Sequence, residues 1–108
     1  MRRDRATAAA DQTEAQLVEA ENVVRREVRA AVRDIELARE QVTIAADAAR
    51  LARQQYEMER ERLTLGLTDI FRVLQYEEQV GTVERAEAEA WRAYATAVVQ
   101  YRLAMGEG

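Results

Sequence analysis

The sequence has no cysteine, no histidine and no proline, and each absence narrows what the chain can be. Without cysteine there is no thiol nucleophile and no disulfide, which fits either a reducing compartment or a periplasmic protein that folds without disulfides. Without histidine the chain lacks the commonest metal ligand and general base. Without proline, nothing in the sequence forces a break in a long helix.

Aromatic residues and long apolar runs are also scarce. One tryptophan, four tyrosines and one phenylalanine cannot fill a thick globular core, so burial must come from long, thin helix seams. No run approaches the roughly 20 apolar residues of a membrane-spanning helix. The first five residues lack the apolar region of a signal peptide. If the parent protein is exported, we therefore expect its targeting segment outside this chain.

The residues that are abundant favour helix. Alanine contributes 21 of the 108 residues, and Glu, Arg, Gln and Leu dominate the rest, a bias typical of long helices and coiled coils. The net charge of -4 disfavours contact with phosphates, so we expect no nucleic-acid partner. The length fits one domain or a fragment of one.

Residues 64–69 are the one place where the helical pattern stops and restarts. Gly66 is the first glycine of the chain and suits the left-handed position that closes a helix. We expect Thr68 to cap the next helix through its hydroxyl, and Asp69 to place a negative charge in the first turn. The prediction is an all-α, antiparallel coiled-coil hairpin with its tip at residues 65–68.

The first predicted helix, residues 4 to about 64, carries apolar residues at heptad spacing on two sides. The first seam consists of Val28, Ile35, Val42, Ala49, Tyr56 and Leu63, with Val24, Ala31, Ala38, Ala45 and Ala52 between them. The second stripe consists of Val23, Ala30, Leu37, Ile44, Leu51, Met58 and Leu65. Two stripes indicate neighbours on two sides, as in a barrel of helices or, alternatively, a compact four-helix bundle. A rod of about 90 Å favours the former.

The second predicted helix, residues 69 to about 105, is shorter and ends at Gly106. Its seam consists of Ile70, Val73, Tyr76, Val80, Val83, Ala90, Tyr94, Ala97, Tyr101 and Ala104, with Glu87 as an exception. Gly81 indicates close helix approach or slight bending. The unequal arms leave residues 1–27 without a partner in the chain. We therefore expect residues 1–108 to be one hairpin of a larger domain, self-associating through residues 17–24 and the second stripe.

The search for reaction chemistry finds no candidate. Most carboxylates lie three or four residues from an arginine, as on solvated helix faces. The glutamates of residues 77–89 could be imagined to bridge metals, but a di-iron bundle also needs histidine. There is no phosphate-binding glycine loop. We therefore predict no catalytic residue, no metal, no cofactor and no enzyme activity, and we interpret Trp91 and Tyr94 as packing residues.

Several short motifs surround the tip and mark the second helix. They are Tyr56, Gly66-Leu67-Thr68-Asp69, Val73-Leu74, residues 86–94, and the ending Val98, Tyr101, Ala104 and Gly106. Together they resemble the repeat of TolC-type outer-membrane efflux proteins. Residues 28–35 are similar to a stretch of that family's long helix, and the resemblance runs from about residue 15 to the end.

The resemblance implies a fold and a function. Members of that family are trimers with two such repeats per subunit, which form a twelve-helix periplasmic tube below an outer-membrane barrel. This chain would be one hairpin of one repeat, expected to be the second, in the periplasmic part of the protein. Its neighbours would be other hairpins of the trimeric duct. Its tip residues Gly66, Leu67, Thr68 and Asp69 would contact the hairpins of a periplasmic adaptor protein.

The sequence departs from the family pattern just after the tip. Where the family often has carboxylates near the tube entrance, this chain has Arg72 and Gln75, which would line the entrance instead. Arg72 would either pair with a neighbouring hairpin or point into solvent. Two other functions stay open: the hairpin of an adaptor (membrane fusion) protein, which should return into a lipoyl-like domain, and a coiled-coil scaffold or oligomerisation rod.

Overall fold

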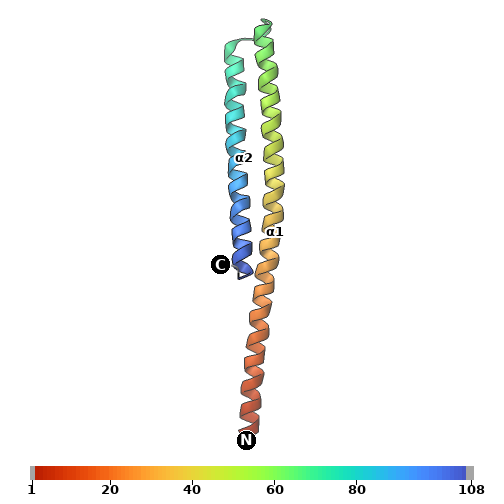
Figure 1. The fold of residues 1–108 in the computed structure, drawn as a ribbon, viewed down its shortest axis with the longest axis vertical. Helices are drawn as coiled ribbons and strands as arrows, with labels where there is room; N and C mark the ends of the chain where they lie inside the picture. The colour runs from red at the N-terminus through yellow and green to blue at the C-terminus, as the bar shows by residue number, and fades with distance from the viewer. Residues whose placement is uncertain (1, 107–108) are drawn as a thin grey trace.

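The computed structural model describes residues 2–106 as two antiparallel helices, α1 (Arg2–Thr64) and α2 (Ile70–Ala104), joined by one short loop (Figure 1). The molecule measures 97 × 18 × 17 Å. The predicted all-α hairpin is confirmed. α1 begins two residues earlier than expected, and α2 begins and ends one residue inside the expected range, differences that are usual at helix ends.

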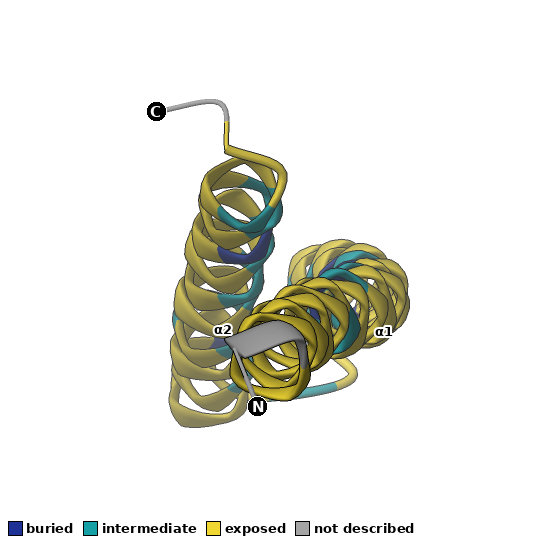
Figure 2. Cartoon of the chain, turned by 90° about the horizontal axis from the view of Figure 1, so that it is seen from below, coloured by how far each residue is buried: buried dark blue, intermediate teal, exposed yellow. Residues whose placement is uncertain are grey.

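The predicted seam between the helices is confirmed from residue 28 to residue 63. Its buried apolar members are Ala31, Val42, Ala49, Ala52, Val73 and Ala97. Most are alanines, whose small side chains leave room for larger seam residues of the opposite helix. In the end-on view of Figure 2, buried and half-buried residues lie where the helices face each other. Val24 and Ile70, at the two ends of the predicted seam, remain exposed.

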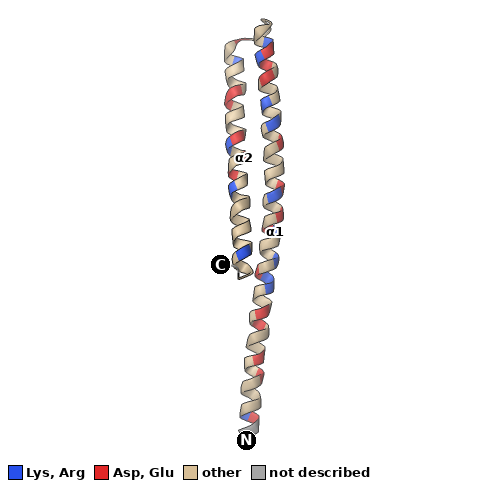
Figure 3. Ribbon diagram, in the orientation of Figure 1, with Lys and Arg blue, Asp and Glu red and all other residues tan. Residues whose placement is uncertain are grey.

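α1 extends well past the end of α2, so the N-terminal part of α1 stands alone (Figure 1). Residues 4–21 are all exposed, including Leu17 and Val18. No helix in the described part of the chain has the length and apolarity needed to cross a membrane. Charged residues of both signs are spread along both helices (Figure 3).

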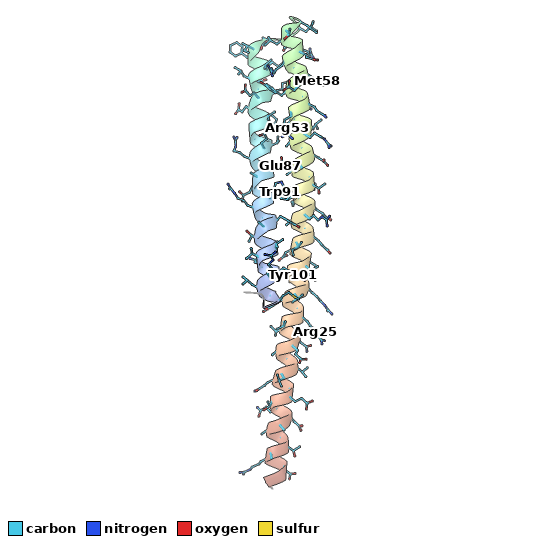
Figure 4. All side chains as sticks on the ribbon, in the orientation of Figure 1. Arg25, Arg53, Met58, Glu87, Trp91 and Tyr101 are labelled. Carbon is cyan, nitrogen blue, oxygen red and sulfur yellow. The ribbon has the colours of Figure 1, made fainter. Side chains whose placement is uncertain are left out.

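Four members of the second stripe of α1 are left uncovered by residues 2–106. Leu37, Ile44, Leu51 and Met58 are 55–61% exposed, although each lies only a few residues from a buried seam residue. Met58 is labelled in Figure 4 near the tip end of α1. One helix therefore carries a covered apolar seam and an uncovered apolar stripe.

Gly81 does not mark a close approach of the two helices. A Cβ built at Gly81 would have one neighbour within 4 Å, the Nη1 atom of Arg85 at 3.4 Å, on the same helix. Of the two interpretations of Gly81, close helix approach is therefore wrong, and slight bending stays a prediction. A methyl group fits there without disturbing α1.

Candidate interaction site at the hairpin tip

Gly66 ends α1 as the sequence predicts. Its φ of 74° is in the left-handed region, where residues with a Cβ are disfavoured. The Leu67 N–H donates to the Arg62 carbonyl at 2.8 Å, and the Gly66 N–H donates to the Leu63 carbonyl at 3.0 Å. These two bonds form a Schellman motif, which satisfies carbonyls at the end of the helix. The turn is therefore fixed by backbone hydrogen bonds.

The cap of α2 is Asp69 and not Thr68. Asp69 has an extended backbone (φ -113°, ψ 166°), and its Oδ1 accepts a hydrogen bond from the Arg72 N–H at 2.9 Å. Leu67 and Thr68 are both used to cross between the helices, so the helix begins one residue later than the sequence predicts. The negative charge of Asp69 still lies beside the positive end of the helix dipole.

The tip is more apolar than the sequence analysis recognised. Its exposed large apolar side chains are Leu65, Leu67, Ile70, Phe71 and Leu74. Phe71 is the only phenylalanine of the chain and is 75% exposed. Phe71 does not belong to the seam, whose members are spaced by three and four residues. A large apolar residue outside the seam is the sequence signal that could have identified it as exposed. An exposed aromatic residue among leucines is typical of a contact surface for another protein.

Arg72 pairs within its own hairpin. Its Nε lies 3.7 Å from Oε1 of Glu59, which belongs to α1. The expectation of a solvent-exposed arginine is confirmed, because 60% of the Arg72 side chain is exposed. The contact with Glu59 was not expected, and a pair with a neighbouring hairpin stays a prediction. Glu59 also departs from the expectation that carboxylates near arginines lie on solvated helix faces, because it occupies a seam position and is buried.

All the predicted tip residues lie at one end of the molecule (Figure 1). Gly66, Leu67 and Asp69 are exposed, and Thr68 is half-buried. Gln75 is exposed and lines a shallow surface depression together with Arg72 and two neighbours on α2. The structure therefore brings the predicted contact residues together and adds the apolar side chains around them.

The remaining candidate groups are the carboxylates and the aromatic residues of the two helices. In residues 2–106, no three carboxylates lie close enough together to hold a metal ion. Trp91 packs edge-to-face on Tyr94, with ring centroids 6.0 Å apart, but half of its surface stays exposed. Arg60 lies over the ring of Tyr56 at 5.6 Å, a cation–π contact along α1.

Comparisons with known proteins give no relative. No protein-family model, no curated protein and no solved structure matches this chain.

Proposed function

We propose that this chain is a periplasmic helical hairpin of an outer-membrane efflux or export duct. In this proposal α1 and α2 form part of the tube wall, and the tip contacts the hairpins of a periplasmic adaptor. The role is transport and not catalysis. The proposal combines the resemblance of the tip and second-helix motifs with the two-sided apolar pattern of α1.

The uncovered stripe of α1 is the observation that carries the proposal. The seam of α1 packs against α2, while Leu37, Ile44, Leu51 and Met58 remain exposed. A helix in the wall of a tube has one neighbour on each side, so it needs two apolar surfaces. In the proposed duct, neighbouring hairpins of the trimer cover this stripe.

The tip supports the proposed contact with an adaptor. The Schellman motif at Gly66 and the Asp69 cap hold the loop in one conformation, so little conformational entropy is lost when a partner binds. Leu67 and Phe71 are exposed beside this ordered turn. Such side chains provide apolar anchors for the tip of another hairpin.

The test uses the full-length parent protein in cells. Leu67→Asp and Phe71→Asp are each expected to reduce adaptor crosslinking and efflux together, because a charge replaces an apolar anchor. Val99→Asp is the matched control, since Val99 is also exposed but lies far from the tip. Unchanged crosslinking and efflux in both tip variants would reject the tip assignment.

The gene that encodes the parent protein provides a separate test. A duct protein is expected to contain a second similar helical repeat, with membrane strands between the repeats. A lipoyl-like domain after the hairpin would indicate an adaptor instead, and the lack of both would favour a scaffold.

A further inference from the structure

The two edges of the seam between α1 and α2 differ in charge. On one edge, Nη1 of Arg53 in α1 lies 3.6 Å from Oε1 of Glu84 in α2. One heptad closer to the tip, the same positions hold Arg60 and Glu77. In an antiparallel coiled coil, a residue that flanks the seam on one edge faces the flanking residue of the other helix on the same edge. This edge of the hairpin is therefore charged in the half that is nearer the tip.

The opposite edge has no charge over the middle of the hairpin. The positions that face each other there hold Gln55 with Gln79, and Ala48 with Ala86. Residues three or four apart share a face of a helix. Leu51 is three residues from Ala48 and four residues from Gln55, so it lies on the same face of α1 as these two residues. The exposed stripe of α1 is therefore next to the uncharged edge.

These residues form one continuous surface, here called the neutral face. On α1 it consists of Leu37, Ile44, Leu51 and Met58, all large and apolar. On α2 it consists of the small, exposed residues Thr82, Ala86, Ala93 and Thr96. Glu89 lies seven residues from both Thr82 and Thr96, so it is the one charged member of this face on α2. Its Oε2 is 3.4 Å from Nη1 of Arg92.

We propose that the neutral face binds a second copy of this chain, forming an antiparallel four-helix bundle with both tips at the same end. A two-fold axis parallel to the helices places α1 of each copy against α2 of the other. The large side chains of α1 then pack on the small residues of α2 twice, once in each direction.

The size of the neutral face suits a stable dimer. The 22 residues from Leu37 to Met58 extend over about 32 Å at the rise of an α-helix, and two helices are about 20 Å wide. Burying that area on both partners removes roughly 1,300 Å² from water, within the range of specific interfaces. The charged edge cannot be buried in this way without desolvating Arg53, Glu84 and their neighbours.

The N-terminal overhang is a poorer docking surface. If the seam spacing is continued into the overhang, Val24 and Leu17 alternate with Glu21 and Glu14. Pairing two overhangs side by side would bring these glutamates together, which is unfavourable. We therefore assign the self-association of the isolated chain to the neutral face. In the proposed duct, neighbouring hairpins would occupy this face instead.

The first test is sedimentation equilibrium of the purified chain. Ile44→Glu/Leu51→Glu puts two charges on the neutral face, at side chains already exposed in the hairpin, so the fold is retained. Leu74→Glu/Val99→Glu is the control, with the same number of charges at exposed apolar residues outside the neutral face. We expect dimers for the wild type and the control, and at least tenfold weaker association for the neutral-face variant at equal helicity by circular dichroism. A monomeric wild type, a larger oligomer, or an unaffected variant would overturn the proposal.

The second test determines the arrangement of the two copies. Because the chain has no cysteine, single cysteines report specific contacts. Leu51 of one copy is expected to lie beside Thr82 of the other. Oxidising a mixture of Leu51→Cys and Thr82→Cys chains should give a crosslinked heterodimer, while Leu51→Cys alone should give little crosslinked product. Efficient Leu51→Cys homodimers would overturn the arrangement with both tips at one end.

Discussion

Glu59 of α1 and Arg72 of α2 face each other across the hairpin beside the tip, with Oε1 and Nε 3.7 Å apart. The Glu59 side chain is 6% exposed and the Arg72 side chain 60% exposed. Oε1 of Glu59 has no hydrogen-bond partner within the described part of the chain. Glu59 is a buried charged residue in a seam whose next members are Tyr56 and Leu63, and one half-solvated arginine replaces only part of its lost hydration.

Replacing Glu59 with leucine is expected to stabilise the hairpin. Glu59→Leu keeps a similar volume and removes a buried carboxylate, so the free energy of unfolding should rise by about 1–3 kcal/mol. Urea denaturation at one fixed chain concentration measures the change, since association also affects apparent stability. Glu57→Leu is the control, because Glu57 is exposed and its pair with Arg60 spans 3.7 Å in solvent. The control should change stability by less than about 0.5 kcal/mol.

Removing Arg72 is expected to have the opposite effect. Arg72→Ala leaves the buried Glu59 carboxylate without its counter-charge, so the free energy of unfolding should fall by about 1–2 kcal/mol. In the Glu59→Leu background the same substitution should have little effect. This double-mutant cycle isolates the pair. Equal losses in both backgrounds would show that Arg72 acts through some other contact.

Replacing Gly66 is expected to destabilise the turn through the backbone alone. A Cβ at Gly66 would meet no atom within 4 Å, but φ is +74°. Gly66→Ala should therefore lower the free energy of unfolding by about 1–2 kcal/mol, and Gly66→Asn by less, because asparagine tolerates the left-handed region. Thermal unfolding followed by circular dichroism checks this order. An alanine variant as stable as the wild type would contradict the observed turn.

Heptad periodicity made the seam and the uncovered stripe predictable, because an apolar residue recurs every seven positions in the series that contain Val42 and Leu51. Gly66 was predictable because its left-handed conformation restricts the residue type. The position of the cap was not, since Thr68 and Asp69 are equally good caps in sequence. Burial of Glu59 was also missed, because a single glutamate among charged neighbours is typical of a solvated surface. Adaptor contact and duct assembly remain predictions, because the packing within one chain does not determine its partners.

Asp69 and Thr68 give a direct test of where α2 begins. Asp69→Ala removes the acceptor for the Arg72 N–H and should cost about 1 kcal/mol of stability. Asp69→Asn keeps an acceptor and should recover most of the loss. Thr68→Ala should cost less than Asp69→Ala in the same urea denaturation series. The reverse order would mean that Thr68 caps the helix in solution.

Deleting the N-terminal overhang is expected to leave the rest of the hairpin intact. Residues 4–21 are all exposed, so a chain that begins at residue 22 loses no seam contact. The free energy of unfolding should stay within about 0.5 kcal/mol of the wild type, as for surface changes in general. The helical circular dichroism signal per molecule should fall in proportion to the number of helical residues deleted. Association through the neutral face should persist in sedimentation equilibrium. A shortened chain that becomes monomeric would instead place the contact between copies in the overhang, as the sequence pattern of residues 17–24 first indicated.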